Sequence, residues 1–138
     1  MKILKPLLLL LLVVSLTFAQ SPGHSFGYEI VKNPLGKLIL KAKVEVADKG
    51  LFLGVSIYPP NVVNLLDEGI HFSIPVKQGI FVREFEIEPV FENGTFEAAL
   101  WTGKLTKDQC PPDDAICQKL GYKHTGMASY VWGYLKTK

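Results

Sequence analysis

The chain has few residues of the types that build metal centres or nucleophilic active sites. It contains two cysteines and three histidines among 138 residues. His24, His71 and His124 lie far apart in the sequence and lack the close spacing of zinc ligands. A Gly-x-Ser-x-Gly nucleophile elbow and a phosphate-binding loop are also missing. We therefore expect no metal and no cofactor, and a non-catalytic role is favoured over an enzymatic one.

Long hydrophobic runs are missing as well, and the longest one lies near the N-terminus. Residues 7–14 are eight consecutive apolar residues, well short of the ~20 that a membrane-spanning helix needs. They follow Lys2 and Lys5 and precede the small-x-small cleavage site Thr17-Phe18-Ala19. This order predicts a signal peptide over residues 1–19, a secreted or periplasmic protein, and no membrane span after cleavage. A retained membrane anchor is the alternative.

A net excess of charge of one sign is absent once the predicted signal peptide is removed. Residues 20–138 carry 13 basic and 13 acidic side chains. A nucleic-acid-binding protein needs a clustered basic face, so that class is excluded. The charges are unevenly distributed: most charged residues in the range 67–97 are acidic, and most charged residues in the range 104–138 are basic. This polarity suits a charged protein partner or head-to-tail contacts between copies, although two solvated sheet edges would give the same pattern.

The remaining sequence is dominated by the alternation of β-strands. Every second residue from Leu38 to Val46 is apolar, while Lys41, Lys43 and Glu45 lie between them, which is typical of a half-buried strand. Strand patterns are seen in seven segments, residues 28–32, 37–46, 51–58, 69–76, 79–91, 95–105 and 122–136. Residues 61–68 fit one helical turn or a crossover between sheets.

Residues 111–121 predict a short helix that ends at Gly121. We therefore expect one domain, residues 20–138. Its predicted fold class is all-β, an immunoglobulin-like antiparallel β-sandwich of about seven strands with one short helix near the C-terminal third.

Two turns predict β-hairpins. Residues 47–50 separate the strand patterns of residues 37–46 and 51–58 by a short polar turn that ends in glycine. Asn93-Gly94 separates residues 79–91 from residues 95–105, and Asn-Gly is a strong hairpin signal because both residues tolerate positive φ. We expect each pair of strands to be neighbours in one sheet.

Cys110 and Cys117 are spaced to close a short loop in an exported chain, which predicts one disulfide. A reactive thiolate would need exposure and a favourable charge environment, and the adjacent Asp113 and Asp114 oppose it. The residues therefore favour a structural disulfide, with a redox-active pair as the alternative.

The arrangement of these features resembles the N-terminal periplasmic domain of the transmembrane thiol:disulfide interchange reductases. The resemblance rests on the strand at residues 37–46, on Gly50-Leu51-Phe52-Leu53, and on a late cysteine pair after Ala99-Leu100-Trp101. It implies an immunoglobulin-like sandwich in which Cys110 and Cys117 exchange electrons with periplasmic partners. In that family the cysteines are one residue closer, and an aromatic-Pro-Pro sequence follows the second cysteine rather than Pro-Pro following the first.

An aromatic stripe, Tyr130, Trp132 and Tyr134, occupies alternate positions near the C-terminus. In a strand all three side chains point to one face, and we place Met127, Val131 and Leu135 on the other. We expect the stripe to line the sandwich core, because such cores are built from large apolar residues. The alternative is an exposed binding platform for a protein partner or a carbohydrate.

Two further features concern the surface. Asn93-Gly94-Thr95 is a sequon for N-glycosylation on a predicted turn. Residues 20–33 form an arm with alternating apolar residues that could complete a neighbour's sheet by strand addition, although an ordinary first strand is favoured.

Together these patterns predict an exported, non-catalytic binding module that acts through protein or surface contacts and could self-assemble. A periplasmic thiol–disulfide redox domain is the alternative.

Overall fold

The structure is a computed structural model that describes residues 25–137. The predicted signal peptide, residues 1–19, and residues 20–24 of the predicted arm lie outside the described residues. Within the described part the strands are β1 Ser25–Lys32, β2 Leu38–Val46, β3 Leu51–Tyr58, β4 Ile70–Val76, β5 Gly79–Ile87, β6 Thr95–Thr106 and β7 Tyr122–Tyr134.

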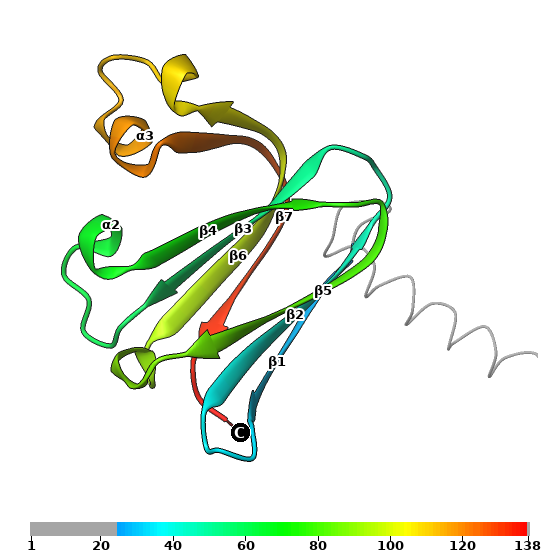
Figure 1. Cartoon of the computed structure of the whole chain (residues 1–138), viewed down its shortest axis with the longest axis vertical. Coiled ribbons are helices and arrows are strands. Elements are labelled where there is room, and N and C mark those ends of the chain that lie inside the picture. Colours follow the sequence, from blue (N-terminus) through cyan, green and yellow to red (C-terminus); the bar gives the residue numbers. More distant parts are fainter. Residues whose placement is uncertain (1–24, 138) are drawn as a thin grey trace, which may run out of the picture.

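The strands form two antiparallel sheets that face each other (Figure 1). The smaller sheet has the order β1-β2-β5, and the larger has the order β4-β3-β6-β7. The predicted all-β sandwich of seven strands is therefore confirmed. In constant-type immunoglobulin domains the fourth strand belongs to the sheet of the first, second and fifth strands. Here β4 pairs with β3 in the other sheet.

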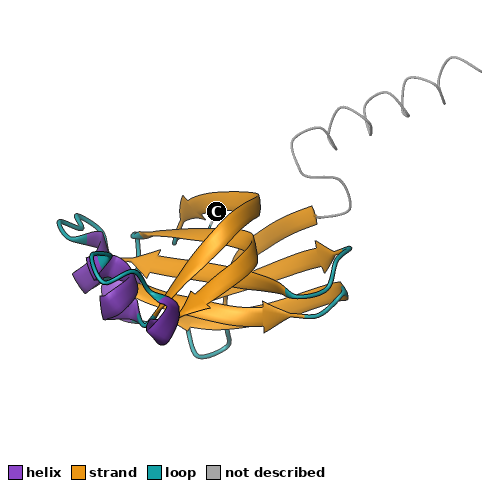
Figure 2. Cartoon of the chain, turned by 90° about the horizontal axis from the view of Figure 1, so that it is seen from above, coloured by secondary structure: helices purple, strands orange, loops and turns teal. Residues whose placement is uncertain are grey.

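Short helices occupy the connections and gather at one end of the sandwich (Figure 2). Helix α2, Leu65–Glu68, is the helical turn that residues 61–68 permitted, and Asn64 caps its N-terminus. Helix α3, Ala115–Leu120, confirms the predicted helix. Asp114 accepts a hydrogen bond from the Cys117 backbone N–H, and Gly121 ends the helix with a φ of 82°. Two 3₁₀ turns, η1 Pro89–Phe91 and η2 Lys107–Gln109, complete the set.

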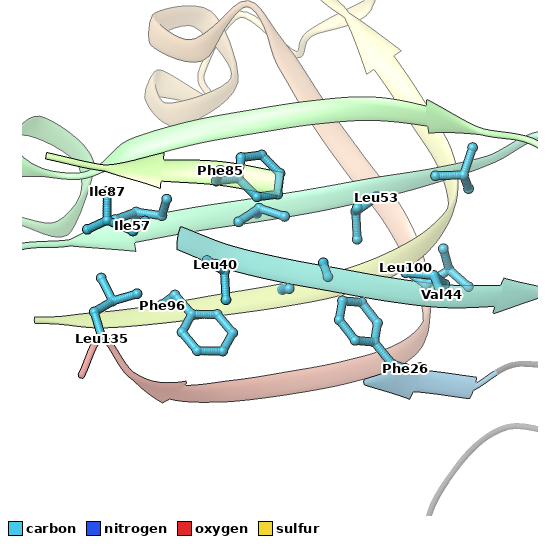
Figure 3. Packing of buried hydrophobic residues seen from close by; sticks show 14 of the residues in the cluster. Phe26, Leu40, Val44, Leu53, Ile57, Phe85, Ile87, Phe96, Leu100 and Leu135 are labelled. Carbon is cyan, nitrogen blue, oxygen red and sulfur yellow. The ribbon is translucent and has the colours of Figure 1, made fainter. Parts of the chain in front are cut away.

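The core lies between the two sheets and is made of alternate residues from every strand (Figure 3). Leu40 and Val44 on β2 face Leu53 on β3 and Phe96 and Leu100 on β6, and each of these five is at most 1% exposed. No polar or charged residue of the described chain is fully buried. Hydrophobic burial between the sheets is therefore the main source of stability.

Both predicted hairpins are wrong. Residues 47–50 connect β2 to β3, and these strands belong to different sheets. Asn93-Gly94 likewise connects β5 to β6 across the sandwich. Turn η1 takes the chain across, and its Phe91 is buried in the core. Asn93 does have a positive φ of 64°, and its backbone N–H donates to the Leu135 carbonyl, so the turn anchors the end of β7 rather than joining two neighbours.

Leu53→Ala is expected to lower the free energy of unfolding by about 3–4 kcal/mol, because it leaves a cavity at a fully buried site. Leu35→Ala provides the matched control, since Leu35 is 87% exposed in the turn between β1 and β2. We expect the control to change stability by less than about 0.5 kcal/mol. Urea unfolding monitored by tryptophan fluorescence measures both, and equal effects would contradict this description of the core.

Candidate binding face

The outward side of the four-stranded sheet, here called the outer face, carries aromatic and polar side chains of β6 and β7 that the core does not use. On β6, Phe96, Ala98 and Leu100 are buried between the sheets. Because strand side chains alternate, Glu97 and Trp101 point to the outer face. The register of β7 then places Trp132 opposite Glu97, Tyr130 opposite Ala99 and Tyr134 opposite Thr95.

The aromatic stripe lies on this outer face and is exposed. Tyr130 is 48% exposed, and Trp132 and Tyr134 are each 54% exposed. The expectation that the stripe lines the core is therefore wrong. The core side of β7 is instead occupied by the smaller residues Val131 and Gly133, and by Leu135 just beyond the end of the strand.

A β-bulge in β7 explains a second error. Leu100 pairs with Ser129, but the next residue, Trp101, pairs with Met127, so Ala128 is one extra residue in β7. The extra residue reverses the alternation, and Met127 therefore lies opposite Trp101 on the outer face, 57% exposed. The prediction that Met127 shares a face with Val131 is wrong for this reason.

Glu97 is held by two tyrosines of the outer face. The Tyr58 hydroxyl donates to Glu97 Oε1 over 2.8 Å, and the Tyr130 hydroxyl donates to Oε2 over 2.9 Å. Tyr58 comes from β3 and Tyr130 from β7, so the carboxylate joins the strands on either side of β6. We call these three residues the Glu97 cluster.

The protons of the Glu97 cluster are fixed by its surroundings. The pKa of Tyr58 is raised to about 12, mainly by burial; a hydrogen bond with Ser56 opposes this rise and the neighbouring Glu97 adds to it. Burial, with Glu97 second, also raises the pKa of Tyr130. Both phenols therefore keep their protons at neutral pH and donate them to Glu97. The Ser56 hydroxyl lies 2.8 Å from His71 Nδ1, which extends the network to β4.

Beyond the bulge, β6 and β7 continue as a long hairpin that turns back over the outer face of β3 and β4. We call residues 101–127 the distal hairpin (Figure 1). His124 fastens it to the sheet, because its Nε2 lies 2.8 Å from the Ser73 hydroxyl on β4. The His124 ring also stacks on Trp101, with centroids 5.4 Å apart and an interplanar angle of 17°.

A glycine on β3 permits this close approach. A Cβ at Gly54 would lie 2.8 Å from His124 Cε1 and 2.8 Å from Trp101 Nε1, too close for any side chain. Lys104 of the distal hairpin covers the rings of Phe52 and Tyr122, with its Nζ 5.7 and 4.9 Å from their centroids. The hairpin is thus packed on the sheet at its base by aromatic and cation–π contacts.

The tip of the distal hairpin is also anchored. Lys119 of α3 forms an ion pair with Asp67 of α2, which links the basic and acidic segments seen in the sequence within one chain. Between the hairpin and the sheet lies a cavity of about 250 Å³, lined by residues that include Ser56, Glu97, Trp101, His124 and Tyr130. The Glu97 cluster therefore borders a concave part of the outer face.

Cys110 and Cys117 form the predicted disulfide at this tip, with a Cα–Cα distance of 5.7 Å. The two cysteines are 8% and 1% exposed. The disulfide joins Cys110, directly after η2, to Cys117 within α3, on the far side of the bulge from the aromatic stripe. The fold thus places these two sequence-predicted sites on one hairpin but does not bring them together.

The other predicted surface sites lie elsewhere. Asn93 is exposed in the turn between the sheets. The described part of the predicted arm forms edge strand β1, which pairs with β2. A cleft of about 900 Å³ lies between β1 and the end of β7, next to Tyr28 and Tyr134.

Tyr58, Glu97, Trp101 and His124 were not predicted as site residues. The alternation of residues 95–105 puts Glu97 and Trp101 on one face of a strand, but it does not show which strands are its neighbours. Across residues 25–137, no group of three or more histidine, cysteine, aspartate or glutamate side chains is arranged to hold a metal ion. In the same range no helix is long and apolar enough to cross a membrane.

No protein-family model, curated protein or solved structure matches the chain.

His124 is expected to make stability depend on pH. Burial, with the nearby Lys104 second, lowers its pKa from 6.5 to about 4. A histidine whose pKa is lowered by folding stabilises the protein above pH 6.5, and this contribution is lost as the pH falls toward 4. The loss should be about 1–2 kcal/mol once solvent screening at this partly exposed ring is allowed for.

Urea unfolding of the protein and of His124→Gln at pH 7.5, 5.5 and 4.0 measures this contribution. The carboxylates titrate in both proteins, so the difference between them isolates His124. We expect that difference to shrink as the pH falls, and a difference that is constant with pH would show that His124 is not held neutral.

Proposed function

We propose that the protein is an exported, non-catalytic binding module that contacts a protein partner, or further copies of itself, through the outer face of its four-stranded sheet. The observation that carries this proposal is the exposure of Tyr130, Trp132 and Tyr134 in one row. Large aromatic side chains with a polar atom are enriched at protein interfaces, because they bury much area and still find hydrogen-bond partners.

The surroundings of the stripe support a binding role over a packing role. Met127 and Trp132 extend an apolar surface that borders a cavity, and exposed apolar surface of this kind is typical of interaction sites. The core is complete without the stripe, since Val131 and Leu135 fill the inward positions of β7. The core therefore does not require the large side chains of Trp132 and Tyr134.

The ring geometry favours a protein ligand over a carbohydrate. Trp132 and Tyr134 meet edge to face, with centroids 5.4 Å apart and an interplanar angle of 72°. A flat sugar-binding platform needs rings that lie parallel to one surface. An uneven row of aromatic edges and faces instead suits the irregular side chains of a protein surface.

The test compares two double variants. Trp132→Ala/Tyr134→Ala removes the stripe, and Ile80→Ala/Val82→Ala removes two side chains of β5 that are 67% and 57% exposed on the other sheet. We expect the stripe variant to bind at least about tenfold more weakly and the β5 variant to bind like the unchanged protein, because hot-spot aromatics dominate interface energies.

The measurement has two arms. Sedimentation velocity over a range of concentrations reports contacts between copies. A partner captured from extracts of the producing organism is purified, and its dissociation constant is measured for each variant. If the stripe variant retains both self-association and partner affinity, the outer face is not the binding surface.

A thiol–disulfide redox domain is the second candidate, and the disulfide between Cys110 and Cys117 is the observation that favours it. The resemblance to the periplasmic reductase domains points the same way. The burial of both cysteines argues against it, because exchange requires an attacking thiolate to reach one sulfur atom.

We therefore expect a structural disulfide with a reduction potential below about −300 mV, which glutathione redox buffers measure. Cys110→Ala/Cys117→Ala should lower the free energy of unfolding by about 2.5 kcal/mol on the loop-entropy model, without weakening partner binding. A potential near −200 mV, together with a mixed disulfide trapped in Cys117→Ala, would favour the redox domain instead.

A further inference from the structure

The Glu97 cluster has an unusual hydrogen-bonding character, because every donor in it is already used. Tyr58 and Tyr130 each give their one hydroxyl proton to Glu97. A carboxylate has about four acceptor positions, so roughly two remain open on Glu97. The phenol oxygens likewise keep lone pairs but have no further proton to donate. The polar centre of the outer face therefore accepts hydrogen bonds and donates none.

The Glu97 cluster is linked to β4 through Ser56. The Ser56 hydroxyl lies 2.8 Å from His71 Nδ1, and a hydrogen bond with Ser56 opposes the rise in the pKa of Tyr58. His71 Nε2 is buried without a hydrogen-bond partner among the described residues. The tautomer of His71 decides whether Ser56 or His71 donates, so the accepting character of the site rests on the two phenols and Glu97.

The charge of Glu97 is not neutralised within the described chain. In residues 25–137, no lysine, arginine or histidine nitrogen lies within 4.0 Å of its carboxylate. On the opposite sheet, by contrast, Glu84 pairs with Lys41 over 3.5 Å and Glu86 pairs with Lys37 over 3.9 Å. Glu97 receives phenol protons where those glutamates receive ammonium groups.

Aromatic rings surround the same carboxylate. Trp132 lies directly opposite Glu97 in the β6–β7 register, and Tyr58 and Tyr130 reach it from either side. The faces of such rings carry negative electrostatic potential and attract cations. A half-buried carboxylate among aromatic rings is therefore attractive to a cation in two ways, through its charge and through the ring faces.

We propose that the Glu97 cluster and Trp132 form a recognition site for a basic side chain, an arginine or lysine presented by the protein partner. A guanidinium or ammonium group donates hydrogen bonds and accepts none, which complements a centre that only accepts. It also brings the missing positive charge, and it can stack on the Trp132 ring. The carboxylate is already fixed by two phenols, so little ordering is needed on binding.

This inference rests on the proposed function, because it names what the partner presents to the outer face. A sugar hydroxyl both donates and accepts, so half of its capacity would be unused at the cluster. The basic side chain is therefore the better match, and a sugar becomes one outcome of the test.

The experiment titrates the ¹⁵N-labelled protein with four small probes and follows the backbone amides of β6 and β7 and the indole N–H of Trp132. N-acetylarginine amide and N-acetyllysine amide carry the cation. N-acetylcitrulline amide matches the arginine probe in shape but is neutral, and cellobiose represents a carbohydrate. We expect both cationic probes to shift the resonances around Glu97 with a dissociation constant of about 1–10 mM, a range reasonable for one side chain.

Variants identify the residues responsible. Glu97→Gln keeps the size of the side chain but removes its charge, and we expect binding of the arginine probe to weaken at least about tenfold. Trp132→Ala should weaken it about threefold to tenfold through the lost ring face. Glu84→Gln is the matched control, because it removes the same charge from the other sheet, and it should change nothing.

Three results would overturn the inference. Citrulline could bind as tightly as arginine, Glu97→Gln could leave arginine binding unchanged, or cellobiose alone could shift the Glu97 and Trp132 resonances. A failure here is distinguishable from a failure of the proposed function. If Glu97→Gln keeps partner affinity while Trp132→Ala/Tyr134→Ala loses it, the outer face binds the partner without using a basic side chain.

Discussion

The candidate binding face depends on the antiparallel pairing of β6 with β7. This ladder runs from Thr95 opposite Tyr134 to Thr106 opposite Tyr122, and it carries one extra residue, Ala128. Before the bulge, the ladder sets Trp132 opposite Glu97 and thereby assembles the aromatic stripe around a carboxylate. Beyond it, the same two strands leave the plane of the sheet and cover the outer face of β3 and β4. The bulge thus separates the part of the hairpin that exposes the aromatic stripe from the part that covers the outer face of β3 and β4.

The two halves of this hairpin are stabilised in different ways. The proximal half shares the sandwich core, where apolar residues of both sheets exclude water. The distal half rests on a smaller set of contacts, the stacking of His124 on Trp101, its hydrogen bond to Ser73, and the ion pair between Lys119 and Asp67. The disulfide then closes the tip, where no large core is available. Local reinforcement is placed where hydrophobic burial is least.

Much of the fold followed from the sequence, because alternation of apolar residues is a local signal. It identified all seven strands and the helix that ends at Gly121. It could not identify which strands are neighbours. Residues 47–50 and Asn93-Gly94 are short turns between alternating strands, and a chain that crosses to the facing sheet needs the same turn chemistry as a hairpin. Strands that follow one another in the sequence were therefore predicted to pair, although they lie in different sheets.

The site was predicted less completely, for two physical reasons. A strand has two faces, and composition alone does not say which one is buried, so the larger side chains of β7 were assigned to the core although the smaller Val131 and Leu135 occupy it. The Glu97 cluster joins β3, β6 and β7, and its existence depends on two registers that no local pattern specifies. The alternation of residues 95–105 shows that Glu97 and Trp101 share a face, but it does not show which residues of other strands join them.

The crossing turns also have a kinetic consequence. Because β2 is followed by β3 in the other sheet, its partner β5 begins more than thirty residues after β2 ends. The three-stranded sheet cannot close until that long loop has been ordered, whereas β6 and β7 pair through their own connection. Chains dominated by such distant contacts fold slowly, over milliseconds to seconds. The β6–β7 hairpin would then form before the sheet that buries its core side, leaving an exposed apolar surface while folding is still in progress.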